Sequence, residues 1–276
     1  MRGALVACMI ACIAGLPGGG ALAQRAEVVD RSALRVCADP AAPPLSMRDG
    51  TGVENRIAEL FARDLGVPVT YVWFPTGIGF YRNTLNLRRC DIVMGTATGA
   101  DIAQTTIPYY RSTYVLITRA DEGIAATSLA DPALRDRSIG AQSGSPAIDA
   151  LAGAGLLDAM RAYPLTPDGG AEAVGQRMID DVAAKRIDAA IVWGPIGGYF
   201  AGQRAGLLKV TPLASGSEPS PLAFEIGMAV RFGEARWRAR VETFIRANRP
   251  GIEAILAGAQ VPLLPLAPET KPETGS

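Results

Sequence analysis

Small, hydroxyl-bearing and turn-forming residues gather directly after several apolar runs of the sequence, where a binding site could form. The sharpest group is Gln142, Ser143, Gly144, Ser145 and Pro146. Serine is a good helix N-cap and proline a good first helical residue, so free backbone N–H groups of this turn could hold an anion. The alternative is a plain strand-to-helix turn with a capping serine, which is commoner. The segment by itself leaves both interpretations open.

The remaining candidate binding residues follow other apolar runs. In open α/β sheets, ligands bind beyond the carboxyl ends of the strands, so these residues are expected to line a cleft. Trp193 is either core or cleft wall, and the cleft is favoured because Gly194 and Pro195 stop the strand there. Tyr110 either carries its ring toward the cleft or packs in the core. The candidates of this group are Asp39, Pro40, Thr76, Thr96, Tyr110 and Trp193.

Residues able to catalyse a reaction are scarce. The sequence contains no histidine, which removes the commonest general base and metal ligand and excludes Ser-His and Cys-His nucleophile systems. An enzyme would need Asp39, Glu54 or a lysine as acid or base, and no close pairing suggests it. Asp180 and Asp181 look like paired carboxylates, but their helical context predicts a solvated helix face. We expect no catalytic residue, no metal site and no cofactor.

Hydrophobic periodicity indicates the elements that would position these residues. Short β-branched runs predict strands, and apolar residues three and four apart predict helices. Their alternation implies an α/β protein with parallel sheets and helices on their faces. The predicted strands are 34–38, 67–74, 91–95, 110–119, 137–141, 188–193, 207–210 and 223–231, and the predicted helices are 54–65, 78–89, 145–154, 171–184, 237–248 and 252–256.

The alternation restarts after residue 119, which predicts two lobes. Lobe 1 comprises residues 24–118 and 213–264, and lobe 2 comprises residues 119–212. The connections near residues 118–120 and 212–222 should act as a hinge about a cleft. The tail, residues 265–276, is rich in Pro, Glu, Lys, Thr and Gly and is expected to be disordered.

The first 23 residues have the pattern of a signal peptide. Arg2 precedes an apolar run over residues 4–16, and Ala21, Leu22 and Ala23 form an A-x-A cleavage site. The run is shorter than the roughly 20 residues that cross a bilayer, which argues against a membrane anchor. We expect export to the periplasm and no stable membrane insertion of the mature chain.

Charge and cysteine content narrow the partners further. The net charge is 0, or −1 once Arg2 is removed, so no basic field exists to hold nucleic acid. Cys37 and Cys90 are the cysteines of the mature chain. In an oxidising compartment they favour a disulfide, although neighbouring parallel strands could hold them too far apart, leaving two free thiols.

Nearly all of the mature chain resembles the type II periplasmic solute-binding proteins. Residues 35–40 resemble the opening strand and loop of that superfamily, residues 134–145 its second-lobe strand and ligand-contacting turn, and residues 185–192 a late second-lobe strand. The resemblance implies a two-lobed fold, each lobe a mainly parallel sheet flanked by helices.

A narrower family fits better. Residues 37–40, 54–60, 82–85, 89–95 and 108–115 resemble the quinoprotein-dehydrogenase-associated binding proteins, the MoxJ/XoxJ type of methanol-oxidation systems. The resemblance implies export alongside a pyrroloquinoline-quinone (PQQ) alcohol dehydrogenase and its cytochrome c. It also implies a role in the maturation or activation of that enzyme.

The segment after the third strand departs from the broader superfamily. Amino-acid binders hold the ligand carboxylate with an arginine there, whereas residues 98–103 read Thr-Gly-Ala-Asp-Ile-Ala. A bidentate carboxylate clamp is therefore missing. This favours an accessory protein of the dehydrogenase. The alternatives are the substrate-binding component of an ABC transporter for a small polar solute and, with least support, an enzyme such as a dehydratase.

Overall fold

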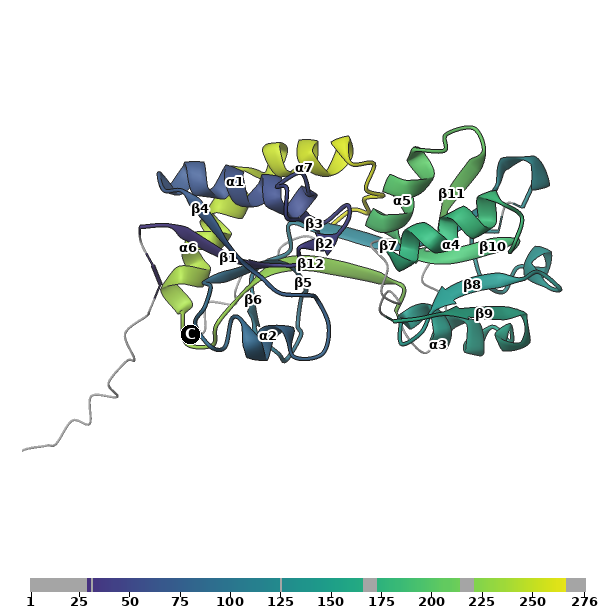
Figure 1. The fold of residues 1–276 in the computed structure, drawn as a ribbon, viewed down its shortest axis with the longest axis horizontal. Coiled ribbons are helices and arrows are strands. Elements are labelled where there is room, and N and C mark those ends of the chain that lie inside the picture. The colour runs from purple at the N-terminus through teal and green to yellow at the C-terminus, as the bar shows by residue number, and fades with distance from the viewer. Residues whose placement is uncertain (1–28, 31, 125, 166–172, 214–220, 267–276) are drawn as a thin grey trace, which may run out of the picture.

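The computed structural model describes residues 29–30, 32–124, 126–165, 173–213 and 221–266. The chain forms two lobes, at the left and right of Figure 1. The predicted signal peptide, nearly all of the predicted disordered tail, and part of the second predicted connection lie outside the described residues.

Lobe 1 is formed by the beginning and the end of the described chain. Its strands are β1 (Leu34–Ala38), β2 (Ala41–Ala42), β3 (Ser46–Met47), β4 (Val69–Trp73), β5 (Ile92–Ala97), β6 (Gln104–Thr105) and β12 (Ala223–Val230). Its helices are α1 (Val53–Leu65), α2 (Phe80–Asn83), α6 (Ala235–Ala247) and α7 (Arg249–Gly258). Strand β1 lies between β4 and β5 and is parallel to both, and β12 joins β5 antiparallel. Helices α1 and α7 lie above this sheet and α2 below it (Figure 1).

Lobe 2 repeats this arrangement with the middle of the chain. Its strands are β8 (Ile139–Gln142), β9 (Met160–Tyr163), β10 (Ala189–Trp193) and β11 (Leu208–Pro212). Its helices are α3 (Pro146–Gly153), α4 (Val174–Ala183) and α5 (Gly194–Gly202), with 3-10 turns at Ala120–Glu122, Pro132–Leu134 and Leu157–Ala159. Strand β8 lies between β10 and β9 and is parallel to both. The parallel core strands place their carboxyl ends at one edge of the sheet.

A single long strand, β7 (Tyr110–Arg119), belongs to both lobes. Its first half pairs with β12 from Tyr110 to Thr113, and its second half pairs with β10 and β11. The strand order β4-β1-β5-β12-β7-β10-β8-β9 therefore runs continuously across the molecule. Among the described strands, β7 is thus the one that pairs with strands of both lobes.

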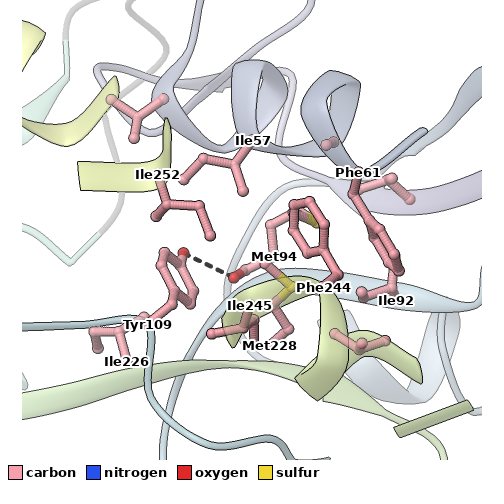
Figure 2. Packing of buried hydrophobic residues seen from close by; sticks show 14 of the residues in the cluster. Ile57, Phe61, Ile92, Met94, Tyr109, Ile226, Met228, Phe244, Ile245 and Ile252 are labelled. Carbon is pink, nitrogen blue, oxygen red and sulfur yellow. Dashed lines mark hydrogen bonds between the residues drawn. The ribbon is translucent and has the colours of Figure 1, made fainter. Parts of the chain in front are cut away.

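The apolar face of the helix at residues 53–65 packs into the core of lobe 1. Ile57 and Phe61 are fully buried, and the Phe61 ring stacks on Phe244 of α6 with 4.3 Å between centroids. Figure 2 shows these rings packed over Met94 of β5, whose carbonyl oxygen accepts a hydrogen bond from the Tyr109 hydroxyl (2.9 Å). Burial of one such phenylalanine stabilises the fold by about 1.5–3 kcal/mol.

Several elements differ from the sequence prediction, and the two-residue strands β2, β3 and β6 were not predicted. The helix predicted over residues 78–89 is only the four residues of α2, followed by turns. Strand β9 was not predicted, because as an edge strand it is mostly exposed and lacks a continuous apolar run. Helix α5 was also missed, since Gly194 and Pro195 read as the end of a strand.

The glycines of α5 serve close packing rather than a turn. A Cβ on Gly194 would collide with the carbonyl oxygen of Thr113 in β7, and one on Gly198 would collide with that of Gln260. The proline at the second position suits the first turn of a helix, where its missing N–H costs nothing.

The helix face that carries Asp180 and Asp181 also differs from the sequence prediction. Asp180 pairs with Arg204 at a partly exposed position. Asp181, however, is 6% exposed and accepts hydrogen bonds from the Tyr163 hydroxyl and from Arg186 Nε. The prediction of a solvated face is therefore wrong for Asp181, which lies three residues after Met178 on the apolar stripe of α4.

The predicted disulfide between Cys37 and Cys90 is confirmed. Their Cα atoms are 5.5 Å apart, and Cys90 lies in the turn ahead of β5 rather than within the strand paired to β1. The bridge thus joins β1 to the turn that leads into β5. None of the helices in the described ranges has the length and apolar character of a membrane-spanning segment.

Candidate functional site

The loops that follow β1 and β4 are held together by Asp39. Its Oδ1 accepts a hydrogen bond from Ala41 N (2.8 Å) and its Oδ2 accepts one from Thr76 N (2.5 Å). The Pro40 carbonyl oxygen accepts a hydrogen bond from Arg48 N (3.0 Å). The structure therefore brings Asp39, Pro40 and Thr76 to one rim of lobe 1, beyond the carboxyl ends of its strands.

The carboxyl end of β5 carries Thr96 within a group of tyrosines. The Thr96 hydroxyl is hydrogen bonded to the hydroxyl of Tyr81 (2.6 Å), which the sequence did not indicate. Tyr110 is 5% exposed and packs edge-to-face against Tyr109, with 5.0 Å between ring centroids. Tyr110 therefore belongs to the lobe 1 core, next to the rim formed by Asp39 and Thr76.

Glu54, in the first turn of α1, lies among these tyrosines. Burial, with a smaller contribution from the negative charge of Asp39, raises the pKa of Glu54 to about 7. Burial raises the pKa of Tyr81 and of Tyr110, and the charge of Glu54 adds to both shifts. The carboxylate is thus close to both hydroxyls and lies in an environment that disfavours its charge.

The turn at residues 142–146, which gave the most specific indication of a binding site in the sequence, lies in lobe 2. Ser145 is the N-cap residue of α3, as expected, but its hydroxyl donates to the Gln142 carbonyl oxygen (2.7 Å) instead of capping a helix N–H. Ser143 N donates to the Tyr163 carbonyl oxygen (2.8 Å), and Gly144 adopts a positive φ of 72°. Hydrogen bonds thus hold the turn in place, and the Ser145 hydroxyl is half-buried beside β7.

Aromatic side chains fill the region where the lobes meet. Trp193 at the end of β10 contacts Tyr114 of β7 (5.5 Å between centroids) and Phe224 of β12 (5.8 Å). The Tyr114 hydroxyl also interacts with Ser145. A shallow hollow of about 260 Å³ is lined by Tyr114, Pro146, Trp193, Phe224 and Ile226. Trp193 thus lines a hollow formed by strands of both lobes and by the start of α3.

Some residues of this region were missing from the sequence-based candidates. Tyr81, Tyr114 and Phe224 gave no signal, because an aromatic residue in or beside a strand reads as core. Glu54 did give one: it stands three residues before Ile57 and seven before Phe61, on the apolar stripe of α1. An acidic residue on an apolar helix face is the feature that could have marked it.

The segment after β5 has no arginine within it. Residues 98–103 form a turn between β5 and β6 in which Asp101 is exposed and Gly99 N donates to Thr105 Oγ1 (3.2 Å). The segment therefore presents an acidic and an apolar side chain and no guanidinium group that could clamp a carboxylate.

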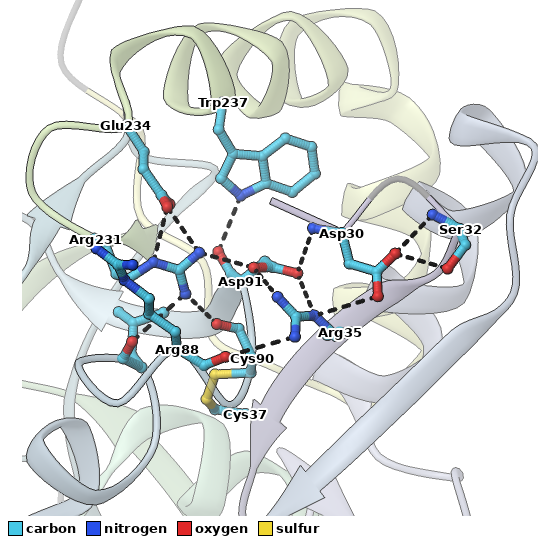
Figure 3. A network of polar contacts seen from close by, with 11 residues as sticks. Asp30, Ser32, Arg35, Cys37, Arg88, Cys90, Asp91, Arg231, Glu234 and Trp237 are labelled. Carbon is cyan, nitrogen blue, oxygen red and sulfur yellow. Dashed lines mark hydrogen bonds and ion pairs between the residues drawn. A yellow bond between two sulfur atoms is a disulfide. The ribbon is translucent and has the colours of Figure 1, made fainter. Parts of the chain in front are cut away.

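A second polar cluster lies at the opposite, amino end of β5. Asp91 is 1% exposed and binds Arg35 and Arg231, each at 2.7 Å, while its carbonyl oxygen accepts from Trp237 Nε1 (2.9 Å) (Figure 3). Arg231 also binds Glu234 (2.7 Å). The Asp91 carboxylate is thus paired with two guanidinium groups, so this cluster stabilises the fold.

Comparison with known proteins places this geometry in a family. No family model matches the chain. The chain is 32% identical to Protein MoxJ of Methylorubrum extorquens over 259 residues, which covers 89% of this chain and 86% of the relative. The chain belongs to the MoxJ family.

Solved structures give the same result for the fold. The periplasmic binding protein XoxJ from Methylobacterium extorquens AM1 is 39% identical, with a TM-score of 0.72 over 84% of this chain and 100% of that chain. MxaJ from Methlophaga aminisulfidivorans is 25% identical, with a TM-score of 0.76 and the same coverage. The predicted two-lobed type II periplasmic binding protein fold and the predicted MoxJ/XoxJ membership are confirmed.

Proposed function

We propose that this chain is a periplasmic accessory protein that assists a PQQ-dependent alcohol dehydrogenase of a methanol-oxidation system. Membership in the MoxJ family is the observation that carries the proposal. The similarity to XoxJ, named a periplasmic binding protein, supports the location. The segment at residues 98–103, which has no carboxylate clamp, supports a role other than amino-acid capture.

The two-lobed fold would serve this role as a binding device rather than as a catalyst. In the proposed division, lobe 1 comprises residues 24–118 and 213–264 and lobe 2 residues 119–212. Strand β7 (Tyr110–Arg119) crosses this division, because its second half pairs with β10 and β11 of lobe 2. The rim residues Asp39, Pro40 and Thr76, with Thr96, the turn at 142–145 and Trp193, would line the cleft, and Tyr110 would support its wall from the core. Bending at β7 would change the relative orientation of the lobes that a partner meets.

Affinity capture tests the proposal. The tagged mature chain is added to periplasmic extract of its own source organism, and bound proteins are identified by mass spectrometry. We expect the quinoprotein dehydrogenase to be recovered, with its cytochrome c as a further partner. The tag alone, added to the same extract, serves as the control. Absence of any dehydrogenase, together with micromolar binding of a small solute, would contradict the proposal.

A transport role is the second candidate. The hollow between β7, β10 and β12 is open, and hydroxyl-bearing residues line the strand ends, as in a receptor for a small polar solute. Such a receptor would associate with a permease and its ATPase instead of a dehydrogenase. Capture of those membrane components from detergent extract would favour transport.

A further inference from the structure

Glu54 stands out because its carboxylate has no partner. Among the described residues, none donates a hydrogen bond to it and no lysine or arginine forms an ion pair with it. Its oxygens are not sealed off, since the residue keeps part of its surface accessible. A carboxylate that is largely desolvated, still accessible to solvent and unpaired is able to accept a ligand, and its surroundings are called the Glu54 recess below.

The strand beneath Glu54 makes room for the carboxylate. A Cβ on Gly95 of β5 would collide with Glu54 Oε1, so only a glycine lets the carboxylate rest on the strand. Gly95 has no positive φ that would require glycine for backbone reasons. Glycine at position 95 therefore leaves room for the Glu54 side chain.

The surroundings are rich in electrons and poor in positive charge. Tyr81 and Tyr110 lie near the carboxylate, and the charge that shifts its pKa is that of the acidic Asp39. The Asp39 oxygens already accept backbone hydrogen bonds, whereas those of Glu54 do not. Phenol rings attract cations through their faces, so the recess favours a positively charged ligand.

An apolar surface adjoins the acidic recess. Thr96, next to Gly95, pairs with Gly227 of β12, and the adjoining Ile226 pairs with Tyr110 and lines the aromatic hollow with Trp193. A ligand with a charged head and a short apolar body could place its head at Glu54 and its body against these side chains.

We infer that this cleft binds an organic ammonium group, with the Glu54 carboxylate as its counter-ion and the Trp193 hollow as the site for its alkyl portion. The inference rests on the proposed use of the fold as a binding device and names the ligand class of that cleft. A purely structural carboxylate does not account for the arrangement, because two structural acids of this lobe, Asp39 and Asp91, both have partners.

Binding of a cation is coupled to the proton on Glu54. With a pKa of about 7, the carboxyl is mostly protonated at pH 5.5 and mostly ionised at pH 8. An ammonium ion binds only the ionised form, so its affinity rises by about thirty-fold between these pH values. A neutral ligand of the same shape shows no such rise.

Isothermal titration calorimetry with butylammonium tests the inference, with n-butanol and butyrate as neutral and anionic probes of similar size. We expect butylammonium to bind best, with the pH dependence stated above. Glu54→Gln should weaken binding at pH 8 by at least about ten-fold, the value of one lost charge contact. Gly95→Ala should weaken it too, because the added methyl displaces the carboxylate. Glu59→Gln, at an exposed position of the same helix, is the matched control and should leave binding unchanged.

Several outcomes overturn the inference. These are equal binding of butylammonium by the wild type and Glu54→Gln, equal binding of n-butanol and butylammonium by the wild type, and no binding of any ammonium probe at millimolar concentration. Glu54-dependent binding of Ca²⁺ in place of butylammonium also overturns it. Recovery of the dehydrogenase is scored separately: recovery without ammonium binding sinks only the inference, and ammonium binding without recovery sinks only the accessory role.

Discussion

Two acidic residues lie at opposite ends of strand β5 and have opposite environments. Asp91, at the amino end, is held by Arg35 and Arg231 and anchors α6 through Trp237 (Figure 3). Glu54, over the carboxyl end, has no hydrogen-bond donor or cation among the described residues. Asp91 is the more buried of the two, so the lack of partners at Glu54 does not follow from deeper burial.

The different environments of Asp91 and Glu54 imply different roles, one in stability and the other in binding. A buried carboxylate with cations and donors around it keeps its charge at little net cost, and its removal leaves unpaired charges behind. A desolvated carboxylate without partners costs free energy in the unliganded protein, and that cost is offset only when a ligand supplies the missing charge. The amino end of β5 therefore stabilises lobe 1, and its carboxyl end is the part able to bind.

Removal of Asp91 gives the largest expected effect. Asp91→Ala leaves the guanidinium groups of Arg35 and Arg231 without their shared carboxylate, so the free energy of unfolding should fall by about 3–5 kcal/mol. Urea unfolding followed by circular dichroism measures this loss. Asp64→Ala, which breaks the partly exposed pair with Arg240, is the control and should cost less than about 1 kcal/mol. Equal losses in the two variants would show that the Asp91 network is not a special source of stability.

Loss of the disulfide should give the next largest change in the free energy of unfolding. The Cys37→Ser and Cys90→Ser double variant frees a loop of 53 residues, so the free energy of unfolding should fall by about 2–4 kcal/mol. The wild type unfolded with and without dithiothreitol gives an independent value. Ammonium binding by the folded double variant should persist, because Glu54 and Gly95 are not part of the bridge. Unchanged stability in the double variant would contradict the expectation.

Glu54→Gln gives a smaller and opposite effect on stability. Folded Glu54 holds its proton up to about pH 7, whereas the unfolded chain loses it near its ordinary pKa of 4.5. Between these values the folded state binds more protons, so wild-type stability falls as the pH rises and is level above pH 7. Relative to Glu54→Gln, the wild type should lose about 2 kcal/mol between about pH 4.5 and pH 8, after allowance for partial exposure.

Urea unfolding at both pH values measures this difference, with Glu59→Gln as the matched variant of the same helix. A constant difference between wild type and Glu54→Gln across this range would mean that the pKa of Glu54 is not raised. In that case the contrast with Asp91 disappears, since both carboxylates would be equally well accommodated.

The same contrast shows what the sequence could predict. The apolar stripe of α1 and the β-branched runs of β1 and β5 predicted the fold, because their periodicity depends only on neighbouring residues. Asp181 and Glu54 both stand on apolar helix faces, yet one is paired by Tyr163 and Arg186 and the other is not. Partners that come from distant parts of the chain decide between these outcomes, and periodicity does not report them.

Helix α5 shows the same limit for backbone features. Residues 194–198 are of the types found in turns, yet they form the start of a helix. Their glycines are explained by the close approach of this helix to Thr113 and Gln260. The candidate residues at the strand ends were predicted from topology alone. Their tyrosine neighbours were not, because an aromatic side chain carries no sequence signal that distinguishes a cleft wall from a core.

Trp193→Phe gives the smallest expected effect and tests how far the binding end of β5 extends. Phenylalanine keeps a ring against Tyr114 and Phe224, so the free energy of unfolding should change by less than about 1.5 kcal/mol. Of the three tryptophans, Trp193 lines the hollow, whereas Trp237 is packed beside Asp91 in the opposite cluster and Trp73 stacks on Tyr71 of β4. Butylammonium should therefore change the tryptophan fluorescence of the wild type and of a Trp237→Phe variant, but not that of Trp193→Phe. A full response in Trp193→Phe would confine the ligand to the Glu54 recess and exclude the hollow between the lobes from the binding site.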